Sequence, residues 1–307
     1  MMHRRLKVGT RGSKLALVQT HLFVSKIKEF FPELITEVKI IKTSGDKFQE
    51  VDLTQIEGKG FFTKEIEDEL LSGQIDIAVH SLKDLPTDLH EELTIGAVLP
   101  RDNPEDVLIS KYNKLFTELP SGATIGTSSL RRMVQIKRIR PDLNVQPLRG
   151  NITTRITKLY HSDIDAIIVS RAAIERLELQ NLITEIFSPE VIIPAVGQGV
   201  IALEIRNDNL FAKEILEGLN SIETEYAVRA ERAFLRELGG GCKNPIAAFA
   251  EIVDYEIYIE GMVASADGEY FFRDSTFGLA MNPEDVGRKL AQKLIALGAK
   301  TLLSRKV

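Results

Sequence analysis

Three segments of the sequence combine hydroxyl or amide side chains with arginine where a strand is expected to pass into a helix. They are residues 10–13, 126–132 and 148–155. The first turn of a helix leaves backbone N–H groups unpaired, and these donors together with the helix dipole attract anions. Arginine adds a planar fork that binds a carboxylate through two hydrogen bonds. A single segment of this kind is usually only a helix cap, but three of them favour a site for a ligand with several carboxylates.

The charge of the chain is distributed unevenly. The formal net charge is −5, which argues against a general nucleic-acid-binding surface, because such surfaces are basic. Between residues 127 and 155, however, seven residues are basic and only Asp142 is acidic. This local excess of positive charge indicates a site for anions, and a solvated helix face is the alternative that the count leaves open.

Residues 79–86 place an acid beside a cation where a buried strand is expected to end. Asp84 directly follows Lys83, and two interpretations stay open. The pair is a simple salt bridge, or Asp84 is an ionised carboxylate that stabilises a cationic intermediate or moves a proton. His80 has no partner at metal-ligand spacing among the five histidines, so we expect a structural role for it and no metal site.

Two glycine-rich segments carry further reactive side chains. Lys59 lies between two glycines, which is typical of a mobile lid over an anionic ligand and equally of an ordinary loop. Cys242, the only cysteine, follows three glycines and precedes Lys243, so it can be exposed and form a thiolate; an inert thiol is the alternative. One cysteine allows neither an intrachain disulfide nor a multi-cysteine metal site.

The side chains named above must be positioned by strands and helices. Strand-like and helical patterns alternate over the first two thirds of the chain, which predicts α/β layers. We expect strands at residues 6–10, 38–42, 75–79, 123–127, 145–147 and 166–170, and helices at residues 15–30, 62–70, 130–139 and 152–160. After residue 221, a helix, three strands and a last helix predict a small α+β domain with an antiparallel sheet.

Two proline-containing segments, residues 100–104 and 194–199, separate the two α/β blocks. We therefore expect the chain to leave a first domain, build a second and return, with a ligand-binding cleft lined by both. The predicted boundaries are residues 1–100 with 195–218 for domain 1, residues 101–194 for domain 2 and residues 219–307 for domain 3. No apolar run suits a signal peptide or a membrane span, so we expect a cytoplasmic protein.

Seven segments together resemble the porphobilinogen deaminase family, in the order that this family has and across nearly the whole chain. They are residues 10–13, 58–62, 79–86, 126–132, 148–151, 194–199 and 240–242. The resemblance implies that the first two domains are like type II periplasmic binding proteins and that the third carries the cofactor cysteine. The cofactor is then a dipyrromethane joined to Cys242 by a thioether.

The implied activity is that of a transferase in tetrapyrrole and haem biosynthesis. Porphobilinogen loses ammonia to give an azafulvene, which the free α-position of the growing chain attacks. Four additions and a hydrolysis release hydroxymethylbilane. We expect porphobilinogen as the substrate, no nucleic acid or membrane partner, and a monomer that passes its product to uroporphyrinogen-III synthase.

The resemblance also assigns roles to single residues. Asp84 would be catalytic, stabilising positive charge on pyrrole nitrogens while it contacts the cofactor, and Lys59 would belong to a lid over the substrate. The residues implied to hold cofactor carboxylates are Lys83, Thr127, Ser129, Arg131 and Arg132. Those implied to hold substrate or the growing chain are Arg11, Ser13, Arg149, Arg155 and Arg176.

Two segments depart from the family pattern. Residues 170–174 replace a small apolar run and bring in an unexpected Arg171, and residues 243–248 differ after the cysteine. Neither change removes a residue named above. The alternative function is a non-catalytic anion-binding protein of the type II class, which predicts an unmodified Cys242 and no turnover.

Overall fold

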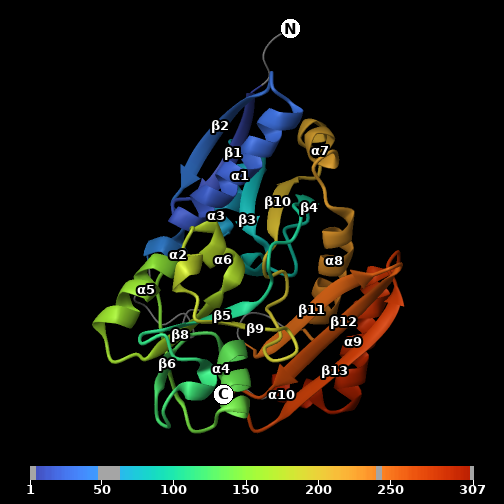
Figure 1. The fold of residues 1–307 in the computed structure, drawn as a ribbon. Helices are drawn as coiled ribbons and strands as arrows, with labels where there is room; N and C mark the ends of the chain where they lie inside the picture. Colours follow the sequence, from blue (N-terminus) through green and yellow to red (C-terminus); the bar gives the residue numbers. More distant parts are fainter. Residues whose placement is uncertain (1–4, 48–62, 240–243, 305–307) are drawn as a thin grey trace. The chain divides into compact units, whose positions relative to one another are not determined.

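The computed structural model describes residues 5–47, 63–239 and 244–304, and these residues form two compact units (Figure 1). Unit 1 comprises Met1–Arg101 and Val200–Glu225, and unit 2 comprises Asp102–Gly199 and Tyr226–Val307. The chain thus enters unit 2 at Asp102 and leaves it after Gly199. We call residues 102–105 the first crossing segment and residues 194–199 the second crossing segment.

Unit 1 is built on a five-stranded sheet with the order β2-β1-β3-β10-β4. Its strands are β1 (Arg5–Arg11), β2 (Ile35–Ile41), β3 (Ile77–Ser81), β4 (Leu93–Val98) and β10 (Ile201–Arg206). β1 runs parallel to β2 and β3, whereas β10 is antiparallel to β3 and β4. The helices are α1 (Lys14–Phe30), α2 (Ser44–Lys47), α3 (Lys64–Leu71) and α7 (Leu210–Glu217). Phe23 and Ile27 of α1 pack with Leu203 of β10 in the core.

Unit 2 contains a second five-stranded sheet with the order β7-β6-β8-β5-β9. Its strands are β5 (Asp106–Ser110), β6 (Thr124–Gly126), β7 (Asn144–Gln146), β8 (Ala166–Ser170) and β9 (Glu185–Phe187). β6 is parallel to β7 and β8, and β5 is antiparallel to β8 and β9. The helices beside it are α4 (Leu130–Ile139), α5 (Ile152–His161) and α6 (Arg171–Arg176).

The C-terminal part of unit 2 is a three-stranded antiparallel sheet of β11 (Ile246–Val253), β12 (Glu256–Ala264) and β13 (Phe271–Leu279). The helices of this part are α8 (Ile222–Glu237), which begins in unit 1, α9 (Pro283–Ala296) and α10 (Ala299–Ser304). Phe234, Ile259 and Leu290 are buried together in its core. Val134 of α4 packs against Ala247 and Met262, so the small sheet contacts the five-stranded part of the same unit.

The predicted fold class, two α/β sheets and a small α+β part, is confirmed. The three domain boundaries stay a prediction. Several elements were not predicted: β4, β5, β9, α6 and α7 are short, and none has a long periodic pattern. In the described ranges, no helix combines the length and the apolar character that crossing a bilayer requires.

The packing of α9 on α8 depends on a glycine. A Cβ atom at Gly287 would collide with the carbonyl oxygen of Ala230 and come within 2.9 Å of the backbone nitrogen of Phe234. Neither backbone atom can move without displacing α8. We expect Gly287→Ala to lower the free energy of unfolding by about 1–3 kcal/mol, because overpacking forces the helices apart.

Urea unfolding of the purified variant measures this change. Gly218→Ala is the matched control, since Gly218 ends α7 with φ −75° and ψ −10° and has open space where the Cβ would lie. We expect its effect to stay within about 0.5 kcal/mol. Equal unfolding curves for Gly287→Ala and the wild type would contradict the close packing.

Candidate functional site

Each of the three predicted strand-to-helix segments leads into a helix that a polar side chain caps. The Oγ of Ser13 accepts a hydrogen bond from the N–H of Ala16 at 3.2 Å at the start of α1. Ser129 caps α4 in the same way, and Asn151 caps α5. β6 and β7 are neighbours in the sheet of unit 2, so the starts of α4 and α5 follow adjacent strand ends. Ligands of open α/β sheets bind at such ends.

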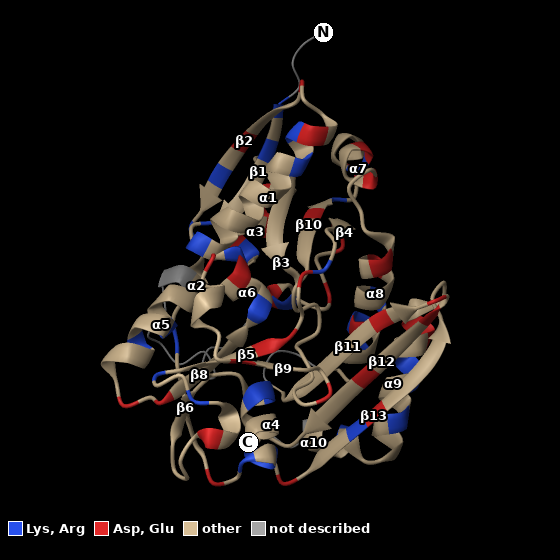
Figure 2. Ribbon diagram, in the orientation of Figure 1, with Lys and Arg blue, Asp and Glu red and all other residues tan. Residues whose placement is uncertain are grey.

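Arg131 and Arg132 lie on the first turn of α4 and are almost completely buried, with 6% and 5% of their surface exposed. Both bind one carboxylate, that of Asp106 at the start of β5. Arg131 Nη1 lies 2.7 Å from Asp106 Oδ2, and Arg132 Nη2 lies 2.7 Å from Oδ1. Figure 2 shows the basic segments of α4 and the acidic segment at β5. We call Asp106, Arg131 and Arg132 the buried charge cluster.

Backbone and amide groups complete the shell of this cluster. Arg131 Nη1 also donates to the carbonyl of Ile193 at 2.8 Å, and Arg132 Nη1 donates to that of Ile168 at 3.1 Å. Gln198, in the second crossing segment, donates to Asp106 Oδ1 at 2.9 Å. Both guanidinium groups are therefore fixed in position before any ligand binds.

The buried charge cluster carries one more positive than negative charge. Burial by itself would raise the pKa of Asp106, but the charges of Arg131 and Arg132 hold it well below its usual range. Burial lowers the pKa of Arg131, although a guanidinium stays charged in proteins. The Nε of Arg132 is buried and has no hydrogen-bond partner among the described residues. An excess charge and an unused donor, both out of water, suit a further carboxylate.

Asp84 and Lys83 belong to a single 3₁₀ turn, Leu82–Asp84, directly after β3 in unit 1. Leu82 and Leu85 are buried, and the N–H of Leu82 donates to the carbonyl of Val200 at 3.0 Å. These anchors leave Asp84 exposed. An exposed carboxylate on a fixed turn is accessible to a ligand.

His80 has the structural role that we expected. Its Nε2 lies 3.0 Å from Oε2 of Glu204 on the neighbouring strand β10, and both side chains are buried. Burial raises the pKa of Glu67 on α3, and the charge of Glu204 raises it further. Glu67, His80 and Glu204 therefore interact electrostatically within unit 1.

The remaining predicted arginines are half-buried, and they lie at a strand end, in a loop or on a helix. Arg11 ends β1, and Arg149 and Arg155 flank the start of α5. Arg155 Nε donates to the carbonyl of Gly150 at 2.8 Å, which holds the side chain against its own loop. Gly150 has φ +115°, a conformation that side chains rarely adopt, so the turn between Arg149 and the helix requires glycine.

Arg176 and Arg171, at the two ends of α6, contact the first crossing segment. Arg176 Nε lies 2.8 Å from Asp102 Oδ2, and its Nη2 donates to the carbonyl of Gly199 at 2.6 Å. Arg171 Nη1 lies 3.1 Å from Glu105 Oε1. The unexpected Arg171 is therefore a structural ion-pair residue.

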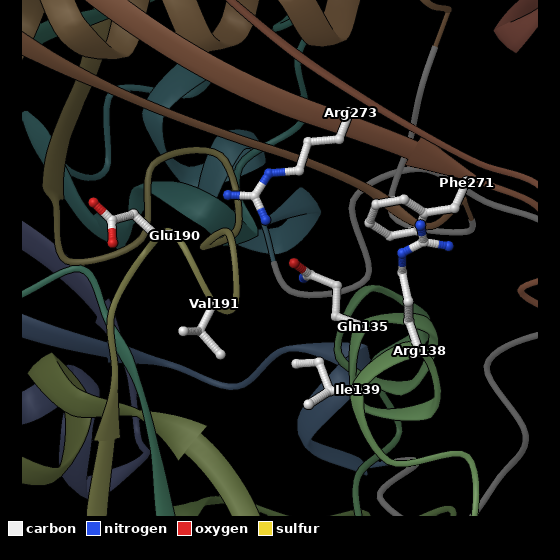
Figure 3. Close-up of a pocket in the computed structure, with 7 residues that line it drawn as sticks. All are labelled: Gln135, Arg138, Ile139, Glu190, Val191, Phe271 and Arg273. Atoms are coloured by element: carbon white, nitrogen blue, oxygen red, sulfur yellow. The ribbon is translucent and has the colours of Figure 1, made fainter.

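A hollow of about 490 Å³ lies between α4 and β13 (Figure 3). Arg138 stacks on the ring of Phe271 with 4.7 Å between the guanidinium carbon and the ring centroid, and Arg273 is bound to Glu260 at 2.6 Å. Glu190 also lines the hollow, with its carboxylate directed away from the arginines in Figure 3. This hollow contains none of the predicted site residues, so it does not correspond to the anion site that the sequence indicates.

Two predicted residues, Lys59 and Cys242, lie outside the described residues, as do the whole segments 58–62 and 240–242 in which they occur. Among the residues that the structure does describe, no three His, Cys, Asp or Glu side chains are grouped so as to hold a metal ion.

Sequence reasoning missed three polar residues that organise unit 2: Asp106, Gln198 and Glu231. Glu231 on α8 is fully buried and accepts hydrogen bonds from the N–H groups of Gly197 at 2.7 Å and Ala250 at 2.9 Å. The only sequence signal for Asp106 is an acid that begins an apolar strand near a cluster of arginines. Its partners lie 25 and 26 positions away along the chain.

Comparisons with known proteins match nearly the whole chain. The family model described as "Porphobilinogen deaminase, dipyromethane cofactor binding domain" matches residues 6–228, and "Porphobilinogen deaminase, C-terminal domain" matches residues 225–296. A porphobilinogen deaminase of Syntrophomonas wolfei is 46% identical over 300 residues, covering 98% of each chain. One from a Geobacillus species is 47% identical over 304 residues, covering 98% of this chain and 97% of the relative.

Among solved structures, the periplasmic aliphatic sulphonate binding protein SsuA from Escherichia coli matches with a TM-score of 0.41 at 12% identity. This match covers 78% of the present chain and 76% of SsuA.

The buried charge cluster makes a prediction about stability and pH. Asp106→Asn removes the one carboxylate that offsets two buried guanidinium groups, so it should destabilise the protein by roughly 3–5 kcal/mol at pH 7. Because the pKa of Asp106 is lowered in the folded state, this contribution is complete above its unfolded pKa of about 3.9 and is lost as the pH falls further. The difference between the wild type and Asp106→Asn should therefore shrink below about pH 4.

Denaturant unfolding at a series of pH values tests this. The control is Asp142→Asn, which removes an exposed carboxylate paired with Arg140 at 2.7 Å. A hydrogen bond from Arg140 lowers the pKa of Asp142 to about 2, but exposed pairs contribute little, so the unfolding midpoint should hardly change. Equal effects of the two substitutions would show that the cluster does not depend on Asp106.

Proposed function

The chain belongs to the porphobilinogen deaminase family, and we therefore propose that it is an enzyme that joins four porphobilinogen molecules head to tail with loss of ammonia. The linear product, hydroxymethylbilane, is released by hydrolysis. The observation of the structure that supports this best is the buried charge cluster, which has an unmatched positive charge and an unused donor on Arg132. The non-catalytic alternative is not favoured, because the relatives that match the full length are deaminases.

The residues of unit 2 fit the carboxylates of a dipyrromethane. Arg131 and Arg132 supply charge, and the hydroxyl groups of Ser129 and Thr127 can add hydrogen bonds. Ser129 Oγ accepts from the N–H of Arg132, and Thr127 Oγ1 accepts from that of Ser129 at 3.2 Å. Each hydroxyl then keeps its own proton to donate to a ligand oxygen.

We propose that Cys242 carries this cofactor as a thioether and that Lys83, in unit 1, binds a cofactor carboxylate. When bound, the dipyrromethane supplies the free pyrrole α-carbon to which the first substrate molecule is joined. The protein's own side chains perform the other tasks of the reaction. They must bind the carboxylates of cofactor and substrate, hold the substrate pyrrole ring in place and offset the positive charge that develops on it.

Each porphobilinogen brings an acetate and a propionate group, so every addition needs new cationic partners. We propose Arg11 and Ser13 from unit 1 and Arg149 and Arg155 from unit 2 for this task. The start of α1 suits it, because Ser13 accepts from the helix backbone and can donate its hydroxyl proton outward. Arg155 lies on the first turns of α5 and is held by the bond from its Nε to the carbonyl of Gly150.

Asp84 is proposed as the catalytic residue. When ammonia leaves the aminomethyl carbon, positive charge spreads onto the pyrrole nitrogen, and a carboxylate close to that N–H stabilises it. The anchored turn formed by Leu82 and Leu85 keeps Asp84 exposed to the substrate while limiting its movement. The same carboxylate can accept a hydrogen bond from a cofactor pyrrole N–H.

Several finer properties are proposals that follow from the family. The enzyme is a transferase and a monomer, Lys59 belongs to a lid, and the product passes to uroporphyrinogen-III synthase. A cytoplasmic location agrees with a single cysteine, which leaves no intrachain disulfide for an oxidising compartment to stabilise.

The mass of the purified protein tests the cofactor. Protein from a host that makes porphobilinogen should be heavier than its sequence by one dipyrromethane, and Cys242→Ser should have the mass of the sequence alone, because the thiolate is the point of attachment. Intact-mass spectrometry under denaturing conditions measures both. Unmodified wild-type protein, or an adduct that survives in Cys242→Ser, would contradict the proposal.

Asp84→Asn tests the catalytic role. The amide keeps the shape of the side chain but lacks the negative charge, so single-turnover addition of porphobilinogen by adduct-loaded enzyme should slow by about 100- to 1,000-fold. Asp88→Asn is the control, since Asp88 is an exposed acid four positions further along the chain, and it should leave the rate close to that of the wild type. Near-normal turnover by Asp84→Asn would make Asp84 a salt-bridge residue.

A further inference from the structure

Arg176 touches both crossing segments at the residues where the chain enters and leaves unit 2. Its Nε and Nη2 both lie 2.8 Å from Oδ2 of Asp102, and Nη2 also donates to the carbonyl of Gly199 at 2.6 Å. The two segments are bonded to each other as well, because the N–H of Asp102 donates to the same Gly199 carbonyl at 3.2 Å. The Arg176 guanidinium, Asp102 and the Gly199 carbonyl are therefore each bonded to the other two.

The rest of the first crossing segment is bound in the same manner. Asn103 donates to Glu175 of α6 at 2.7 Å, and Gln198 donates to the carbonyl of Pro104 at 2.7 Å. The N–H of Arg171 donates to the carbonyl of Glu105 at 2.9 Å. Each of the residues 102–105 is thus bonded to α6 or to the second crossing segment.

The burial of Arg176 indicates that, without a ligand, its side chain serves to bind Asp102 and Gly199. Its side chain is 7% exposed, whereas that of Asp102 is 49% exposed. Burial lowers the pKa of Arg176, and the charge of Asp102 acts against this shift. A substrate carboxylate that bound Arg176 at Nε and Nη2 would have to displace both Asp102 and the Gly199 carbonyl. The displaced groups would then need other partners.

The residue that follows the first crossing segment is Asp106, the carboxylate of the buried charge cluster. Gln198 links the two features directly, since its Nε2 donates both to Pro104 O and to Asp106 Oδ1. A displacement of residues 102–105 would therefore move the carboxylate that holds Arg131 and Arg132. The position of the cofactor-binding arginines depends on how firmly the crossing segments are held.

We propose that Arg176 is a positioning residue that fastens the two crossing segments to α6 through Asp102 and Gly199, and that it serves the reaction through Asp106, Arg131 and Arg132. Its main partner is Asp102 and not a substrate carboxylate. The part of this inference that concerns the reaction rests on the proposed function. The part that concerns the crossing segments does not.

A double-mutant cycle of Asp102→Asn, Arg176→Gln and the two combined tests the first part in the absence of substrate. Hydrogen–deuterium exchange of residues 102–106 and 195–199 should become about 10- to 100-fold faster in each single variant, as expected when a charge-assisted hydrogen bond is lost. The double variant should exchange no faster than the faster single variant, because both substitutions remove the same contact. Additive effects, or unchanged exchange in Asp102→Asn, would overturn the proposal.

Turnover by adduct-loaded enzyme tests the second part. If Arg176 acts by position, Asp102→Asn and Arg176→Gln should lower kcat in parallel, with KM for porphobilinogen changed less than kcat. If Arg176 instead bound substrate directly, Asp102→Asn would leave KM unchanged or lower it, whereas Arg176→Gln would raise KM. That outcome would overturn the proposal. Arg176→Lys should fall between the wild type and Arg176→Gln, because lysine keeps the charge but lacks the fork.

Control variants separate this result from general destabilisation. Asp285→Asn and Arg288→Gln change an exposed ion pair within α9, with 2.5 Å between the two groups, and should leave the exchange of residues 102–106 as in the wild type. If Arg176→Gln does not fold, Asp102→Asn alone decides, since its side chain is half exposed. Failure of the proposed deaminase function would appear as an absent adduct and no turnover, while the exchange result would stand independently.

Discussion

The structure of unit 2 depends on one buried carboxylate that binds two arginines. Asp106 starts a strand whose next three side chains are apolar, and it offsets Arg131 and Arg132 at 2.7 Å each. Without it, two buried guanidinium groups would lack a counter-charge, which would cost roughly 3–5 kcal/mol of stability. With it, they are held rigidly with one positive charge in excess. Such an arrangement suits a site that must hold an anionic ligand throughout many reaction cycles.

The same carboxylate connects the site to the segments through which the chain enters and leaves unit 2. Gln198 binds Asp106, and Glu231 of α8 binds the N–H groups of Gly197 and Ala250. The second crossing segment is therefore attached both to the five-stranded sheet and to the three-stranded sheet of this unit. An enzyme that lengthens its bound product step by step has to keep its anchoring groups fixed while other parts adjust, and these polar contacts provide that fixed framework.

Much of the fold could be predicted because it follows from local patterns. The helices that begin near Ser13, Ser129 and Asn151 were expected from capping residues before apolar periodicity, and their caps are formed as expected. The antiparallel sheet of β11, β12 and β13 followed from alternating residues. The strands β4 and β5 and the helix α6 were missed. Each is only five or six residues long, and the sheet or the crossing segments, not local propensity, give them their structure.

The sequence by itself determined the secondary structure of the longer elements, the presence of arginines at helix starts and the family, since all of these are read from neighbouring residues. Only the tertiary structure decided what those arginines bind. Arg131 and Arg132 share Asp106 because antiparallel pairing of β5 with β8 brings a distant acid into the core, and Arg176 binds Asp102 because α6 packs on the crossing segment. The partners of buried charges depend on which distant segments pack together in the core, and the periodicity of the sequence does not predict that packing.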